Sequence, residues 1–242
     1  MRSYQKAFTK FIKLLNDNDL LQYVLVVGSW AEFIYEESGV IEDFEPNIRT
    51  LDMDILIKNL RKPNPPVNII SLANEEKYRI DTDRLNGTNK ILDKRGFEIE
   101  FLIAKKGAGR EPALKTNLGV TAQTLNHMGV LLNNTIECDY LGMKVIVPTP
   151  EAYTIHKMII NSERKYKAEK DLISVKYLWN FLDRNKFEDI RETLTKKERN
   201  RGEVILQQFE KMEETNELVK EAAYTAEHRL IMIRRTLIKS IL

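Results

Sequence analysis

The sequence predicts an α+β protein: a mixed sheet with flanking helices, followed by helices alone. Two observations predict this class. In the first part of the chain, short apolar and β-branched runs alternate with amphipathic stretches, glycines and prolines. After Pro148–Pro150, glycine nearly vanishes, since only Gly202 remains of the ten, and long helical patterns take over. We therefore predict a mixed domain over 1–149 and a helical domain over 150–242.

The elements of the predicted sheet follow one another along the first part of the chain. We expect helices over 8–15, 29–35 and 67–76, buried strands over 23–27, 52–57 and 97–103, short strands over 78–83 and 89–92, and a hairpin over 135–147. The acidic segment 36–48 is expected to be a loop. Residues 62–66 cannot form a helix or a central strand, because three prolines remove backbone donors.

Composition excludes several classes of protein. Lys and Arg number 38 against 36 Asp and Glu, so the net charge of +2 argues against a strongly basic nucleic-acid wrapper. Cys138 is the only cysteine, which excludes an internal disulfide and argues against a thiolate zinc site. No stretch approaches the roughly 20 apolar residues of a membrane span. We expect a soluble cytoplasmic protein without a membrane partner.

Asp52 and Asp54 open the strand predicted over 52–57. Residues i and i+2 of a strand point to the same face, so these carboxylates stand side by side while Met53 and Ile55 face the core. Two carboxylates this close repel each other unless a cation lies between them. Hard divalent ions such as Mg²⁺ prefer carboxylate oxygens and also bind phosphates. The pair is either a metal site or an exposed strand end, and the two aspartates alone do not distinguish these alternatives.

Two further features lie at the ends of predicted strands. Glu98 and Glu100 alternate in the strand over 97–103, so one of them can join the aspartates if the two strands are neighbours. The alternative is an edge strand with a solvated face. Gly28-Ser29 ends the strand over 23–27. The glycine lets backbone approach a ligand, and the serine can cap the next helix, whose free N–H groups attract phosphate. The alternative is an ordinary turn.

The order of these features resembles the nucleotidyltransferase superfamily that includes DNA polymerase beta. Within that superfamily the chain looks like the bacterial standalone nucleotidyltransferases close to the abortive-infection type. The motifs that carry the resemblance are Arg49-Thr50-Leu51-Asp52-Met53-Asp54, the strand over 96–103 and the segment Pro148–Asp171, which contains His156-Lys157, Arg164 and Lys167–Asp171. The second motif aligns Glu100 with the third carboxylate of the family. The resemblance covers residues 20–180.

The resemblance implies a nucleotidyltransferase-like fold and a metal-dependent transfer of a nucleoside monophosphate from a nucleoside triphosphate to an acceptor hydroxyl. The implied catalytic and metal-binding residues are Asp52, Asp54 and Glu100, which would hold Mg²⁺, with two ions expected and Mn²⁺ as a substitute. The implied nucleotide-binding residues are Gly28, Ser29, Arg49, Thr50, Lys157, Arg164 and Lys170. Two departures leave activity open: an insertion between Gly28 and Asp52, and Glu in place of the Asp of many relatives.

Other residues in the helical part have simpler interpretations. Asp171 is expected to pair with a neighbouring base rather than to bind metal, and His156 is interpreted as a satisfied histidine at the domain junction. The apolar C-terminal end over 230–242 is expected to dock internally or to form a homodimer contact.

The sequence also fits two rival hypotheses. The first is a catalytically inactive module with the same fold, acting as a nucleotide sensor or as a partner in a defence or toxin–antitoxin pair. The second is a structural interaction protein whose acids are only solvated. For the enzyme, the acceptor can be RNA, a protein side chain or a small molecule.

Overall fold

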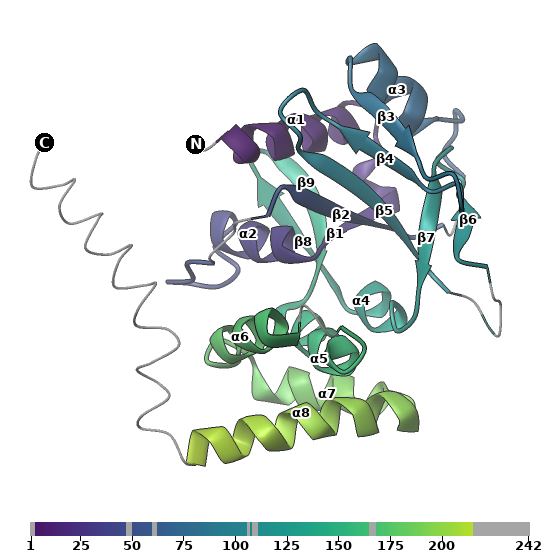
Figure 1. Ribbon diagram of the computed structural model, residues 1–242. Coiled ribbons are helices and arrows are strands. Elements are labelled where there is room, and N and C mark those ends of the chain that lie inside the picture. Colours follow the sequence, from purple (N-terminus) through teal and green to yellow (C-terminus); the bar gives the residue numbers. More distant parts are fainter. Residues whose placement is uncertain are drawn as a thin grey trace, which may run out of the picture.

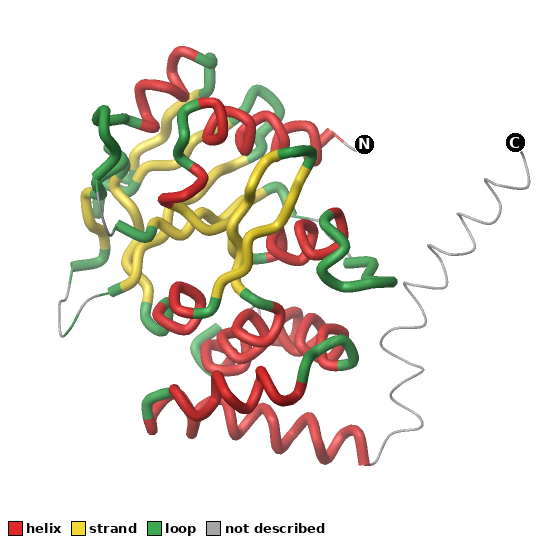
Figure 2. The backbone as a smooth tube through the Cα atoms, turned by 180° about the vertical axis from the view of Figure 1, so that it is seen from behind, coloured by secondary structure: helices red, strands yellow, loops and turns green. Residues whose placement is uncertain are grey.

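The computed structural model describes residues 3–46, 50–59, 62–105, 107, 111–164 and 168–214. The strands gather in one part of the molecule, and four helices pack beneath them (Figures 1 and 2). These helices are α5 (Pro150–Asn161), α6 (Ala168–Trp179), α7 (Arg184–Thr193) and α8 (Lys196–Glu214). The predicted α+β class, with helices following a mixed sheet, is confirmed.

The main sheet has the strand order β1-β2-β5-β4-β3, with β7 paired to β5 and β6 paired to β7. The strands are β1 (Val24–Val27), β2 (Asp52–Ile57), β3 (Arg79–Thr82), β4 (Asn89–Leu92), β5 (Glu98–Ala104), β6 (Ala113–Lys115) and β7 (Thr121–Leu125). Strand β5 runs parallel to β2, which confirms that the Asp and Glu strands are neighbours. On its other edge, β5 pairs first with β4 and then with β7.

The remaining elements cover or extend the sheet. They are α1 (Ser3–Asp17), the 3₁₀ turn η1 (Leu21–Tyr23), α2 (Ser29–Glu37), α3 (Ile69–Glu75), α4 (Gly129–Asn133) and the hairpin β8 (Thr135–Tyr140) with β9 (Met143–Pro148). The apolar face of α1, with Phe8, Phe11, Ile12 and Leu15, is fully buried, as its helical spacing predicts.

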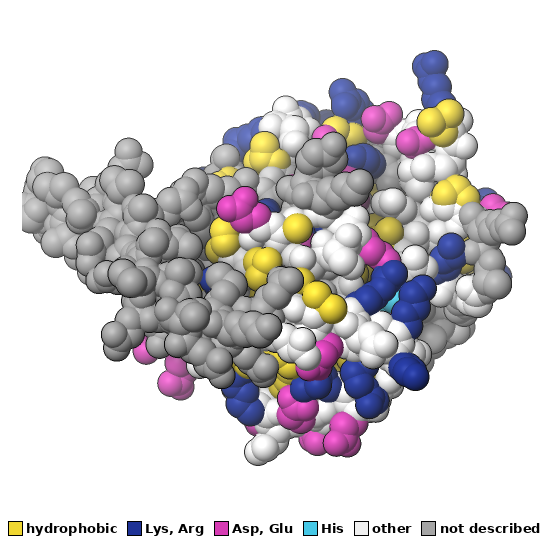
Figure 3. All heavy atoms as spheres, turned by 60° about the horizontal axis from the view of Figure 1, so that its bottom comes forward, with side chains coloured by type: hydrophobic (Ala, Val, Ile, Leu, Met, Phe, Trp, Pro, Cys, Tyr) yellow, Lys and Arg dark blue, Asp and Glu magenta, His cyan; other side chains and the backbone are white. Residues whose placement is uncertain are grey.

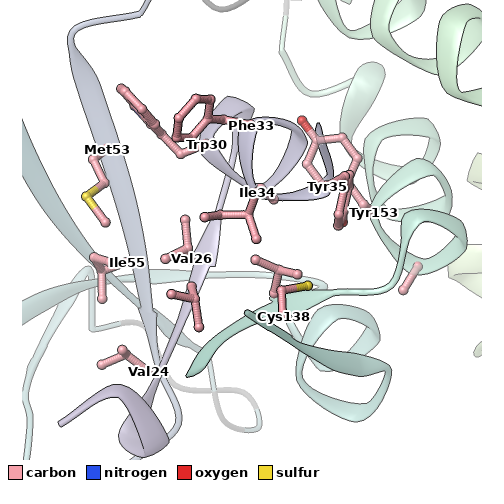
Figure 4. Packing of buried hydrophobic residues seen from close by; sticks show 14 of the residues in the cluster. Val24, Val26, Trp30, Phe33, Ile34, Tyr35, Met53, Ile55, Cys138 and Tyr153 are labelled. Atoms are coloured by element: carbon pink, nitrogen blue, oxygen red, sulfur yellow. The ribbon is translucent and has the colours of Figure 1, made fainter. Parts of the chain in front are cut away.

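Helix α2 packs against β1 and β2 and fixes the strand ends that matter for the site (Figure 4). The Trp30 indole is fully buried and stacks on the Phe8 ring with centroids 4.3 Å apart. Its Nε1–H donates to the backbone oxygen of Asp52 at 3.0 Å. The first residue of β2 is therefore held by a side chain whose own position is set by core packing.

One region differs from the sequence-based expectation. The sequence pattern predicts no element between 111 and 134, yet β6, β7 and α4 lie there. These elements are short, and Thr121–Leu125 mixes polar and apolar residues without the clean alternation that marks a strand. The pairing of β7 with β5 supplies order that the local pattern does not.

A continuous cluster of buried apolar side chains extends from α1 to α8, so the sheet and the helices share a core. The division into domains at residue 149 stays a prediction. The predicted dimer contact over 230–242 lies outside the described residues. Within the described part of the chain, no helix has both the length and the apolar character needed to cross a membrane.

Candidate active site

A cavity of about 380 Å³ lies between the strand ends of the sheet and helices α5 and α6. It brings together the predicted site residues that the structure describes. Its lining includes Gly28, Ser29, Thr50, Asp52, Asp54, Glu100, Lys157, Arg164 and Lys170. Arg49, the remaining predicted nucleotide-binding residue, lies outside the described residues. Residues far apart in the sequence thus share one concave surface, as a ligand site requires.

The acidic wall of the cavity is a row of side chains across neighbouring strands. Asp54 pairs with Val27 of β1 on one side and with Glu100 of β5 on the other. Asp52 pairs with Glu98 of β5, which lies outside the cavity lining. Paired strands lie roughly 5 Å apart, so carboxylates at one register level are near neighbours on one face. All four acids are half-buried.

Gly28 forms the tightest backbone approach to this row. Its φ of +66° belongs to the region that favours glycine, and a Cβ added there would lie 2.6 Å from Oδ2 of Asp54. Its carbonyl accepts the N–H of Ala31 at 3.1 Å, so Gly28 is the N-cap of α2. The expectation that Ser29 caps this helix is wrong, because the positive φ of Gly28 turns strand into helix one residue earlier.

Glu100 has a cationic partner that sequence reasoning missed. The Lys90 ammonium on β4 contacts Oε1 of Glu100 and lies 3.3 Å from Oε2 of Glu98. The hydrogen bond to Glu100 is the largest cause that raises the pKa of Lys90. Recognising this contact required the register that places Lys90 opposite Glu100.

The donor set of the acidic wall suits a hard divalent cation. Asp52 and Asp54 offer carboxylate oxygens on one face, beside a glycine that leaves the backbone bare. In the described part of the chain, however, no three His, Cys, Asp or Glu side chains are close enough together to hold a metal ion. The two aspartates alone thus offer the oxygen ligands that a divalent cation prefers, whereas the Glu100 carboxylate contacts Lys90 instead.

The opposite wall of the cavity is a buried ion cluster. Lys157 Nζ donates to Oδ1 of Asp171 at 2.9 Å, and the Arg164 guanidinium lies 3.2 Å from Oδ2. Asp171 is 1% exposed and Lys157 is 6% exposed. The expectation that Asp171 pairs with a base is confirmed. Because one carboxylate faces two cations, this wall keeps a net positive charge, to which exposed Lys170 adds.

The surface around α5–α8 carries charges of both signs. In Figure 3, Lys and Arg side chains gather around a histidine on this face, with acidic side chains beside them. The cavity itself shares this character, because Lys105 and Glu163 also line it. A polyanionic ligand would therefore meet cations on the helical wall and acids, which need a bridging cation, on the sheet wall.

His156 lies in the wall beside Lys157 and is 6% exposed. Its Nε2 atom has no hydrogen-bond partner among the described residues, so the expectation of a satisfied histidine is wrong for this nitrogen. Burial, followed by the positive charge of Lys157, lowers the pKa of His156 to about 3. The imidazole is therefore neutral near pH 7 and adds no charge to the basic wall.

Hydrogen bonds between α2 and the elements α5, α6 and β9 fix the distance between the two walls. Tyr153 Oη and Ser174 Oγ both donate to Oε1 of Glu32, at 2.6 and 2.5 Å. Tyr35 Oη donates to the backbone oxygen of Pro148 at 2.6 Å, and its ring packs edge-on against Tyr153 (Figure 4). Helix α2, whose N-cap is Gly28, is thus tied to α5 and α6.

Six lining residues come from the region with no predicted element. Three of them are polar: Gln123, Thr124 and Asn126, on β7 and the loop after it. Gln123 pairs with Leu102 of β5, two residues beyond Glu100. Nothing in the local sequence marks these residues, since only the β5–β7 pairing brings them to the cavity.

A family model described as nucleotidyltransferase matches residues 6–198 of the chain. The matched range includes the acidic row, Gly28 and the buried ion cluster. The chain therefore belongs to this nucleotidyltransferase family. A search of curated proteins finds no match.

Two solved structures are similar to this chain at low sequence identity. A crystal structure of an antigenic nucleotidyltransferase-like protein from Paracoccidioides brasiliensis has 12% identity and a TM-score of 0.48, over 87% of this chain and 90% of that one. The solution structure of the antibiotic-resistance factor ANT(2'')-Ia has 13% identity and a TM-score of 0.43, over 86% and 99% of the two chains.

Proposed function

We propose that this protein is a metal-dependent nucleotidyltransferase that moves a nucleoside monophosphate from a nucleoside triphosphate to an acceptor hydroxyl. One observation carries the proposal: a row of carboxylates faces a net basic wall across a single cavity of about 380 Å³. This volume lies in the usual range for small-molecule sites. Membership of the nucleotidyltransferase family supports the same reaction class.

The reaction divides the residues between the two walls. The acceptor hydroxyl would give up its proton to Glu100 or to solvent, its oxygen would attack the α-phosphorus, the bond from that phosphorus to the bridging oxygen would break, and pyrophosphate would leave. Asp52 and Asp54 would hold Mg²⁺, with two ions expected and Mn²⁺ as a substitute, and Glu100 would help activate the acceptor hydroxyl. Bound divalent ions supply charge neutralisation and lower the pKa of the hydroxyl.

The remaining residues position the triphosphate. Gly28 and Ser29 would bring backbone N–H groups at the start of α2 to the phosphates. Lys157, Arg164 and Lys170 would neutralise phosphate charge from the helical wall. Thr50 and Arg49, which precede the aspartates, would support the site. Such transfer depends mainly on positioning and electrostatic stabilisation.

The test is label transfer from each nucleoside triphosphate in the presence of Mg²⁺ and a cell extract, with pyrophosphate release measured in parallel. Asp54→Asn should abolish both signals and leave the melting temperature close to wild type. Asp139→Asn is the matched control, since Asp139 is exposed on β8. Transfer by Asp54→Asn at the wild-type rate would refute the assignment.

A second candidate function is a catalytically inactive nucleotide-binding module, which acts as a sensor or as a defence or toxin–antitoxin partner. The contact of Glu100 with Lys90 favours it, because the third carboxylate is engaged by an ammonium and, among the described residues, forms no three-ligand group with the aspartates. Thermal stabilisation by Mg²⁺ and a nucleoside triphosphate, without pyrophosphate release, would identify this module.

The acceptor is proposed only by class: RNA, a protein side chain or a small molecule. The motifs over 49–54 and 148–171 also support a proposal that the chain belongs with the bacterial standalone, abortive-infection-type nucleotidyltransferases. Identification of the labelled product in the extract distinguishes the three acceptor classes.

A further inference from the structure

Three side chains stand at one register level across three neighbouring strands. They are Asp54 on β2, Glu100 on β5 and Lys90 on β4. Because paired residues of adjacent strands share a face and lie roughly 5 Å apart, Glu100 is the middle member of this row. It has a carboxylate on one side and an ammonium on the other.

In the structure, the Glu100 carboxylate forms an ion pair with the Lys90 ammonium. Lys90 contacts its Oε1 atom, and the same ammonium lies 3.3 Å from Oε2 of Glu98. The side chains of Lys90 and Glu100 are 44% and 28% exposed, so neither is locked by burial. Glutamate has one more rotatable bond than aspartate, so Glu100 can turn from Lys90 toward Asp54 without movement of β5.

We propose that Lys90 competes with the divalent cation for Glu100 and thereby sets the metal concentration at which the acidic row assembles. This inference rests on the proposed function. With the pair intact, the third carboxylate is held away from Asp52 and Asp54. When a cation binds the aspartates, Glu100 exchanges one positive partner for another. Lys90 is a positioning residue here, since it acts through Glu100.

Two physical effects of Lys90 both weaken metal binding. Breaking the Lys90–Glu100 pair opposes metal capture by Glu100, and the nearby positive charge of Lys90 repels a divalent ion. Removing the ammonium therefore strengthens metal binding. The pair is partly exposed, so the change should be small: a fall in half-saturating metal concentration of about two- to fivefold.

The test is a titration of the full chain with Mn²⁺ alone, followed by the loss of the electron paramagnetic resonance signal of free Mn²⁺. Lys90→Met should lower the half-saturating concentration, whereas Lys90→Arg should stay near wild type. Lys115→Met, at an exposed position on β6, is the matched control for loss of a lysine. Melting temperatures in metal-free buffer check that each variant folds.

A double variant ties the effect to Glu100. In a Glu100→Gln background there is no carboxylate to contest, so adding Lys90→Met should change the half-saturating concentration less than it does in wild type. An unchanged or higher concentration for Lys90→Met, while wild type binds Mn²⁺, overturns the competition and leaves the proposed function standing. No Mn²⁺ binding by wild type overturns both.

Discussion

The buried ion cluster on the helical wall gives a stability prediction that is independent of any ligand. Asp171→Asn removes the charge that compensates Lys157, and both side chains are almost fully buried. Removing one partner of a buried pair costs about 3–5 kcal/mol. We expect the lower end, about 3 kcal/mol, because Arg164 is partly exposed and the Lys157 ammonium also lies 5.1 Å from the centre of the Tyr153 ring.

Urea unfolding followed by circular dichroism measures this loss, provided the slope of free energy against urea is unchanged. Asp17→Asn is the control, since Asp17 pairs with Lys13 on the exposed face of α1 and should contribute little. Lys157→Met combined with Asp171→Leu should recover much of the loss, because no buried charge is then left unpaired and the Arg164 guanidinium, which also loses Asp171, is partly exposed to water. A loss for Asp171→Asn no larger than that for Asp17→Asn would contradict this reasoning.

Two further predictions concern the cavity. Gly28→Ala and Gly39→Ala share the strain of a positive φ, about 1–3 kcal/mol, but only at position 28 does the new Cβ meet Asp54. Metal-dependent thermal stabilisation by a nucleoside triphosphate should therefore be lost in Gly28→Ala and kept in Gly39→Ala. Retention of this stabilisation in Gly28→Ala would count against the close approach of Gly28 to the site. His156 has a folded pKa of about 3, below its unfolded value near 6.5, so it contributes stability above pH 6.5 that is lost as the pH falls toward 3. At pH 5 the loss should be roughly 2 kcal/mol relative to pH 7. His156→Gln should lack this part of the pH dependence of unfolding, and the same slope in both proteins would refute it.

Much of the fold could be predicted because its strands carry strong local patterns. Alternating acids and apolar residues in 52–57 and 98–103 mark two strands with one polar face, and their pairing is confirmed. The apolar face of α1 was equally clear. β7 and α4 could not be found in this way, since the order of their short mixed segments comes from pairing with β5 and from packing on the sheet.

In the candidate site, too, the residues marked by a local sequence pattern could be predicted, and those placed by tertiary structure could not. Residue type and spacing indicate Asp52, Asp54 and one of the two glutamates of the next acidic strand. The family resemblance selects Glu100, and the register of β2 and β5 places it level with Asp54 on one face. The sequence does not predict the contact of Lys90 with Glu100, because this contact depends on the register between β4 and β5, which no local pattern specifies. The missing partner of His156 Nε2 has the same origin, since burial at a junction of distant segments is a property of the tertiary structure.

In the proposed enzyme a divalent cation binds between the carboxylates of Asp52 and Asp54, with the triphosphate on the helical wall. Anomalous diffraction from crystals grown with Mn²⁺ and a non-hydrolysable nucleoside triphosphate locates the metal directly. We expect an anomalous peak in contact with both aspartates, with phosphate oxygens next to it. Ordered nucleotide with Mn²⁺ elsewhere, or phosphates bound outside this cavity, would contradict this assignment of the site.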